Sequence, residues 1–208
     1  AVDVSGNAFV SGQAGVLWPT TSGAYLGQIA GTDPYAAPFV TKVAFDGKSV
    51  IYSTFLDYAY EVSGLATLSN GNTFVAGNGT GSNYPTTQNA YQQNLAPGNA
   101  FLTELNSTGS GLVYSTTFGD ASYSTHGLAL DRDGNIWLAG QTSNAQFPMV
   151  NPIQSVYPLP NGFLSEPAST LSEFDPSGQT LKFSTFLGGP ANGYASSVVV
   201  DSTRVVHV

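Results

Sequence analysis

Cysteine is absent from this sequence of 208 residues. A structural disulfide, a thiolate nucleophile and a cysteine-type zinc site are therefore excluded, and the redox compartment is left undetermined. Long hydrophobic runs are absent as well, since no apolar stretch approaches the ~20 residues that a membrane-spanning helix requires. We therefore expect no membrane insertion.

Charge is scarce and mostly of one sign. Charged residues make up 9% of the chain, and 13 acidic against 5 basic side chains give a formal net charge of −8. An acidic chain without a cluster of Lys and Arg repels phosphate backbones and anionic membrane surfaces. We predict that the protein binds no nucleic acid.

The apolar period of an amphipathic helix is also missing. The sequence contains an internal repeat instead. The run LALDRDGNIWLAG at residues 128–140 returns as LATLSNGNTFVAG at residues 65–77 and as VDVSGNAFVSG at residues 2–12. A further copy begins in residues 198–208. Each run reads as two short strands joined by a tight turn, and the interval of about 65 residues indicates a repeat protein.

Three further landmarks follow each hairpin in the same order. An aromatic residue and proline, or a similar step, lie inside a long polar connection at residues 18–21, 84–87 and 147–150. A third strand candidate follows at residues 39–43, 101–105 and 169–174. A Ser-Thr strand candidate closes each unit at residues 50–56, 112–118 and 181–187. Short β-branched and aromatic segments between Gly, Asn, Asp and Pro predict β-strands.

Four antiparallel strands per unit predict an all-β fold made of β-propeller blades. We expect three complete units, at residues 1–63, 64–126 and 127–196, and a partial fourth at residues 197–208. The first strand of each unit would be innermost and the fourth outermost. A Greek-key sandwich is the alternative, but it has no reason to repeat its turn chemistry at a fixed interval. Because a ring needs about four to eight blades, we expect the rest of a longer chain, or self-association, to complete it.

Several of these blocks resemble one known family. SGNAFVSG at residues 5–12, YPTTQNAYQ at 84–92, NAFLTEL at 99–105 and LVYSTTFG at 112–119 are similar to the bacterial SBBP (β-propeller) repeat. The resemblance implies a propeller in a secreted or surface-exposed bacterial protein, in a family whose members mostly lack an assigned activity. The third unit departs from the pattern at residues 147–150 and in the proline-rich residues 157–160.

Oxygen side chains alternate at Asp131, Asp133 and Asn135, as they do in a calcium loop. The pattern of an EF-hand fails, because no Glu follows at the required distance and no helices flank the run. Asx-Gly between two strands is the ordinary chemistry of a tight hairpin turn. We therefore expect a structural turn and no cofactor, with calcium at these residues as the alternative.

The connections between successive units converge on one face of a propeller, together with the long polar connections. Aromatic side chains amid Asn, Gln and Ser on that face suit stacking on sugars or docking of a partner protein. We expect the aromatic-proline steps at Trp18, Tyr84 and Phe147 to fix each long connection to its own blade. The candidate ligand-face residues are Tyr58, Tyr60, Glu61, Asp120, Tyr123, His126 and Tyr194.

His126 stands out because serine, at Ser63 and Ser197, takes the corresponding place in the other units. It precedes Gly127 in a connection that also holds Asp120 and Tyr123, where a lone histidine is more often simply hydrogen-bonded. Carboxylates for glycoside hydrolysis must face each other across a cleft, and Asp57, Glu61 and Asp120 are the candidates. No Gly-x-Ser-x-Gly motif is present.

These observations favour a non-enzymatic interaction module, secreted or on the cell surface, that presents loops to a protein or a polysaccharide. Two alternatives remain at this point. One is a polysaccharide lyase or hydrolase on the same scaffold, with His126 and carboxylates of the connections at the channel mouth. The other is a structural subunit of a surface assembly or filament.

Overall fold

The computed structural model describes residues 1–29, 37–56, 58–79, 84–93, 100–158, 167–189 and 193–208. Within these residues the secondary structure consists of antiparallel β-strands, and no helix is present. Among the described residues there is accordingly no helix that could cross a bilayer. The prediction of an all-β chain is confirmed.

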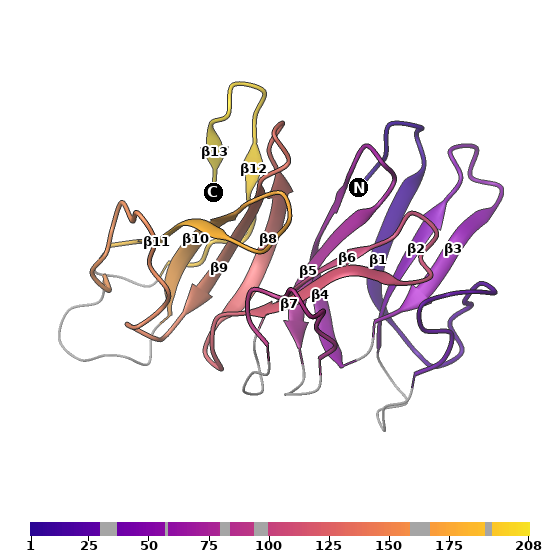
Figure 1. Cartoon of the computed structure of the whole chain (residues 1–208), viewed down its shortest axis with the longest axis horizontal. Coiled ribbons are helices and arrows are strands. Elements are labelled where there is room, and N and C mark those ends of the chain that lie inside the picture. The colour runs from indigo at the N-terminus through magenta and orange to yellow at the C-terminus, as the bar shows by residue number, and fades with distance from the viewer. Residues whose placement is uncertain (30–36, 57, 80–83, 94–99, 159–166, 190–192) are drawn as a thin grey trace.

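The strands form three sheets and a hairpin that follow one another in chain order (Figure 1). The first sheet contains β1 (Ala8–Ala14), β2 (Ala37–Val43) and β3 (Val50–Phe55). The second contains β4 (Ala59–Thr67), β5 (Thr73–Gly79), β6 (Ala100–Leu105) and β7 (Leu112–Phe118). The third contains β8 (Ser124–Leu130), β9 (Ile136–Thr142), β10 (Ala168–Phe174) and β11 (Leu181–Leu187). The short strands β12 (Val199–Val200) and β13 (Val206–His207) pair as a terminal hairpin.

The first sheet has three strands where four were expected. Residues 2–4, predicted as a strand, contribute a single bridge between Val2 and Ala8. The carboxylate of Asp3 accepts hydrogen bonds from the backbone N–H groups of Ser5 and Asn7 at 3.0 and 2.9 Å. Asp3 therefore begins a turn directly after Val2 and does not continue a strand.

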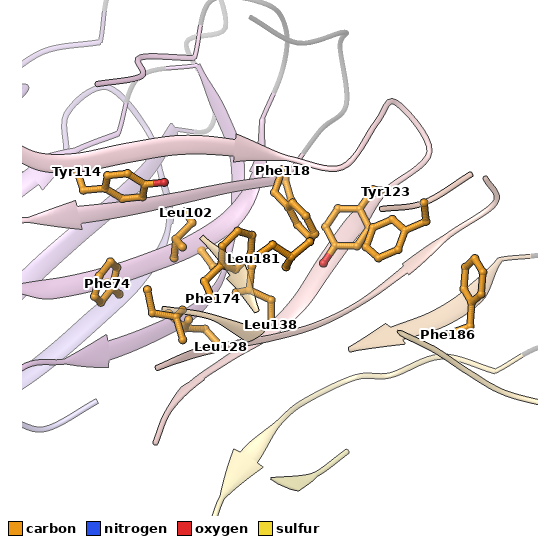
Figure 2. Packing of buried hydrophobic residues seen from close by; sticks show 14 of the residues in the cluster. Phe74, Leu102, Tyr114, Phe118, Tyr123, Leu128, Leu138, Phe174, Leu181 and Phe186 are labelled. Atoms are coloured by element: carbon orange, nitrogen blue, oxygen red, sulfur yellow. The ribbon is translucent and has the colours of Figure 1, made fainter. Parts of the chain in front are cut away.

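Neighbouring sheets pack face to face and share their cores. Side chains of a strand alternate between its two faces, so Val75 joins the cluster shared with the first sheet, whereas Phe74 and Ala76 join the cluster shared with the third. Figure 2 shows the second of these clusters, with Leu102 and Phe118 of the second sheet near Leu138 and Phe174 of the third. The propeller-type stacking of repeated sheets is thereby confirmed, and the described sheets form an open arc rather than a closed ring.

The innermost strands of successive sheets also touch one another, at glycines. A Cβ atom on Gly64 of β4 would lie 2.5 Å from Cβ of Leu128 in β8. A Cβ atom on Gly127 of β8 would lie 2.9 Å from Cα of Ser197, just before β12. Any side chain at these two positions would force the inner strands apart, which explains why glycine stands at both.

The Ser-Thr pattern of the outermost strands binds each long connection to its sheet. The threonine Oγ1 atoms of this pattern accept a backbone N–H from the connection at 2.8–2.9 Å, in the pairs Leu26–Thr54, Gln92–Thr116 and Gln154–Thr185. The preceding serine pairs with a hydroxyl of the neighbouring strand, in the pairs Thr41–Ser53, Thr103–Ser115 and Ser172–Ser184. The recurrent hydroxyls are thus structural.

The aromatic-proline steps fix the same connections from their other end. Trp18 stacks on Phe39 of β2 with 4.1 Å between ring centroids, and Tyr84 stacks on Phe101 of β6 at 4.4 Å. Both observations agree with the anchoring role expected for these residues.

Tyr123, expected on the ligand face, is fully buried instead. The third sheet has Thr170 opposite Gly140, where the first two sheets place Phe39 opposite Gly12 and Phe101 opposite Gly77. The ring of Tyr123 fills the space that this phenylalanine leaves: it lies against Gly140 and stacks on Phe147 at 5.1 Å. Tyr123 is therefore a core residue, and burial raises the pKa of its hydroxyl.

Candidate functional site

Two β-bulges at matching positions shape the inner surface of the arc. In β4 the pairing with β5 shifts between Val62 and Gly64, and in β8 the pairing with β9 shifts between Thr125 and Gly127. The extra residue at a bulge is left out of the ladder, and its side chain is redirected. These extra residues are Ser63 and His126, so His126 lies within a strand and not in the loop where it was expected.

Ser63 and His126 line a common cleft of about 330 Å³, here called the inner-strand cleft. Its lining residues come from the inner strands β4 and β8, from β9 and from the segment that leads into β12. Its lining consists of Glu61, Val62, Ser63, His126, Gln141, Tyr194, Ala195 and Ser196. The structure thus brings together three of the predicted ligand-face residues, Glu61, His126 and Tyr194, and adds Ser63, Gln141 and Ser196.

The cleft lining keeps hydrogen-bonding capacity that the protein does not use. Oγ of Ser63, Nε2 of His126 and Oε1 of Gln141 are buried without a hydrogen-bond partner among the described residues. Buried polar atoms are nearly always paired in native proteins, so each exception calls for an explanation. The cleft lining therefore holds three polar atoms that no described residue pairs.

Gln141 occupies a position at which the other two sheets carry an amide side chain that hydrogen-bonds to the backbone of the next sheet. Nε2 of Gln13, after Gly12, donates to the carbonyl oxygen of Tyr60 at 2.6 Å. Asn78, after Gly77, accepts the N–H of Thr125 at 3.0 Å and donates to its carbonyl oxygen at 3.2 Å. Both amides thereby join their own sheet to the next. Gln141 follows Gly140 in the same way and belongs to the cleft lining, but its Oε1 has no partner within the described residues.

Glu61 supplies the negative charge of the cleft. Its Oε1 accepts a hydrogen bond from Nδ2 of Asn78 at 2.6 Å, which holds the carboxylate in place. None of the described lining residues is Lys or Arg, so no cation faces this carboxylate from the cleft wall. The site is polar and mildly acidic.

Asp120 does not join His126 in the cleft. Its Oδ1 accepts the N–H and the hydroxyl of Ser122 at 2.8 and 2.7 Å, and its Oδ2 accepts Nδ2 of Asn144. Burial acts to raise the pKa of Asp120, but the hydrogen bonds from Ser122 and Asn144 outweigh it, so the pKa is lowered. Asp120 therefore organises its own loop, and the expected grouping of His126, Asp120 and Tyr123 does not form.

A catalytic pair of carboxylates is not found in this cleft. Glu61 is the one carboxylate among its described lining residues. Asp57, the third candidate for such a pair, lies outside the described residues.

Three of the predicted aromatic residues are exposed, but they are not together. Tyr194 lies in the cleft lining and has 62% of its surface exposed. Tyr60 is 61% exposed, and Tyr58 is 42% exposed with a φ of 54°. Both precede the lining residues of β4 and do not belong to the cleft.

The residues of the calcium-loop alternative form a hairpin turn. Oδ1 of Asp131 accepts the N–H groups of Asp133 and Asn135 at 2.9 Å, and its Oδ2 accepts Nδ2 of Asn135 at 2.7 Å. Asp133 pairs with Arg204 at 2.5 Å, which ties the third sheet to the terminal hairpin. Over the described part of the chain, no group of three or more His, Asp or Glu side chains is arranged to hold a metal.

Ser63, Gln141 and Ser196 were not anticipated from the sequence. One signal for Gln141 was present, since an amide follows the closing glycine of all three hairpins, at Gln13, Asn78 and Gln141. The bulges that bring Ser63 and His126 into the cleft lining leave no comparable signal.

Comparison with known families assigns part of the chain. Residues 113–148 match the family model of the SBBP β-propeller repeat. This stretch runs from the outermost strand of the second sheet, through β8 and β9, to the aromatic-proline step of the third unit. The chain therefore carries an SBBP repeat, in agreement with the resemblance noted from its sequence. Comparison with curated proteins gave no significant match.

Proposed function

We propose that this chain is a non-enzymatic interaction module, a propeller segment that binds a protein or polysaccharide partner at its inner-strand cleft. The observation that carries the proposal is the set of unpartnered polar atoms of Ser63, His126 and Gln141 around one cleft. These atoms are buried, so a ligand in the cleft reaches them when the lining side chains turn toward it, and its hydrogen bonds would then replace those that the protein does not make.

Binding is favoured over catalysis by the composition of the cleft. Glycoside hydrolysis commonly requires two carboxyl groups across the bond to be cleaved, and Asp120, one of the candidates for the second, is bound within its own loop. The volume of about 330 Å³ lies at the lower end of the ~300–1,000 Å³ that is typical of small-molecule sites. Such a site suits recognition of a short segment of a partner.

The proposal also places the module outside the cell, as the resemblance to secreted and surface-exposed bacterial propellers implies. Protease treatment of intact producing cells tests this part. The chain should be degraded while a cytosolic marker survives, and protection of both proteins until lysis would contradict an external location.

The binding proposal is tested with a glycan array and a peptide array, probed with the labelled chain and with its Gln141→Leu variant. Gln141→Leu removes the amide whose Oε1 is unpartnered among the described residues, but leaves the bridging amides of Gln13 and Asn78 in place. We expect a partner on one of the arrays whose signal falls in the variant. A partner bound equally by both proteins would show that the cleft is not the binding surface.

One observation favours a second candidate, a polysaccharide-active enzyme: Glu61 and His126 line the same cleft. An array-positive polysaccharide incubated with the chain decides between the two functions. Release of shorter products or of unsaturated ends, lost in His126→Ala, would establish the enzyme.

A further inference from the structure

We infer that the ligand of the inner-strand cleft is an uncharged glycan segment, stacked on Tyr194 and hydrogen-bonded to Ser63, His126 and Gln141. This inference rests on the proposed function and names the class of partner.

The charge of the cleft argues against an anionic ligand. Glu61 is the ionised group in the described lining, and the chain as a whole has a formal net charge of −8. A uronate, sulfate or phosphate group would face this carboxylate without a compensating Lys or Arg. Like charges brought together across an interface oppose association.

The hydrogen-bonding groups of the cleft match hydroxyl groups well. Ser63 and Ser196 each offer one donor and two acceptor positions, the Gln141 amide offers both kinds, and the second oxygen of Glu61 accepts. Sugar hydroxyls are likewise donors and acceptors at once. Tyr194, a residue that is 62% exposed, provides an apolar ring face for a pyranose ring.

The strand edges argue against a peptide that adds a β-strand. Such a peptide needs an evenly spaced row of backbone N–H and C=O groups. The bulges at Ser63 and His126 interrupt that row in both inner strands that border the cleft, and bulges are one way in which proteins prevent edge pairing. We therefore expect the ligand to be recognised by side chains of the cleft and not by backbone pairing with the inner strands.

The test compares the whole chain with three variants on an array of neutral and acidic glycans, with an array of cationic and neutral peptides as a second arm. Tyr194→Ala and Gln141→Leu alter the cleft. Tyr60→Ala is the matched control, because Tyr60 is as exposed as Tyr194 but lies outside the lining. Isothermal titration calorimetry with the best oligosaccharide then gives the affinities.

We expect a neutral glycan to bind, and binding to weaken about tenfold in Tyr194→Ala and in Gln141→Leu but to be unchanged in Tyr60→Ala. Cleft-dependent binding of an acidic glycan or of a peptide instead would overturn this inference and leave the proposed function standing. Neutral-glycan binding that only Tyr60→Ala abolishes would place the glycan site elsewhere and overturn the inference. No ligand on either array would overturn both.

Discussion

Replacement of Tyr114 by Phe should loosen the contact between the second and third sheets. The Tyr114 hydroxyl donates to the carbonyl oxygen of Gly178, in a turn of the third sheet, at 2.5 Å. It also accepts the N–H of Tyr91 at 3.1 Å, which holds the long connection of its own sheet. The side chain is buried, and burial raises the pKa of its hydroxyl. Two backbone groups would therefore lose their partner when one oxygen atom is removed.

The magnitude follows from the burial of each bond. A buried acceptor left unpaired costs about 1–3 kcal/mol, and the partly buried N–H of Tyr91 adds about 0.5–1.5 kcal/mol, since water can reach it. We expect Tyr114→Phe to lower the free energy of unfolding by about 2–4 kcal/mol. For a chain of this length, each 1 kcal/mol shifts the midpoint of thermal unfolding by about 2–4 °C.

The chain contains its own control at the corresponding position of the first sheet. The ring of Tyr52 packs on Gly109 of the second sheet as the ring of Tyr114 packs on Gly178. Its hydroxyl, however, has the Thr73 hydroxyl as its neighbour and binds no backbone group within the described residues. Tyr52→Phe should therefore cost less than about 1 kcal/mol.

The assay is urea unfolding of both variants and of the parent chain, followed by tyrosine and tryptophan fluorescence and by circular dichroism. Equal destabilisation by the two substitutions, or a loss below about 0.5 kcal/mol in Tyr114→Phe, would refute this account of the contact between the sheets.

Three further predictions concern other parts of the arc. Gly64→Ala should cost about 1–3 kcal/mol through overpacking against Leu128, whereas Gly27→Ala, where a Cβ meets its nearest neighbour at 3.8 Å, should be nearly neutral in urea unfolding. Burial acts to raise the pKa of Asp131, but hydrogen bonds from the turn outweigh it and lower this pKa. The ionised carboxylate therefore stabilises the fold above the unfolded pKa of about 4, and this stabilisation is lost as the pH falls through the folded pKa. Asp131→Asn should flatten the pH dependence of unfolding below about pH 4, and an unchanged slope would exclude this role. Thr116→Val should expose the long connection of the second sheet to limited proteolysis without unfolding the sheets, and an unchanged cleavage rate would count against its role as an anchor.

The sequence predicted the hairpins correctly because their chemistry is local. Each turn has a glycine at a position that needs a positive φ: Gly6 after Ser5, Gly71 after Asn70 and Gly134 after Asp133 have φ values of 81, 86 and 85°. The stacking of the sheets could be predicted as well, since strands such as β5 and β6 carry apolar residues toward both faces and a repeated unit can bury them only against its neighbours.

The residues that differ from expectation depend on contacts distant in the sequence. Tyr123 looks like the exposed tyrosines of the other connections, but Thr170, far along the chain, leaves the space in which its ring is buried. The bulges at Ser63 and His126 depend on how two strands pair, which no single strand reveals. Asp3 was expected in a strand, although Asp131 and Asp201 stand at the same position of later units and accept the same backbone N–H bonds as Asp3 does.

Chemical-shift mapping tests the location of the binding surface most directly. The ¹⁵N-labelled chain would be titrated with the neutral oligosaccharide that the array identifies, and the backbone amide shifts followed. We predict that the largest changes occur at Ser63, His126, Gln141 and Tyr194. Changes centred on the connections that hold Trp18 and Tyr84, with the cleft residues unmoved, would contradict the claim that the inner-strand cleft is where this protein binds its partner.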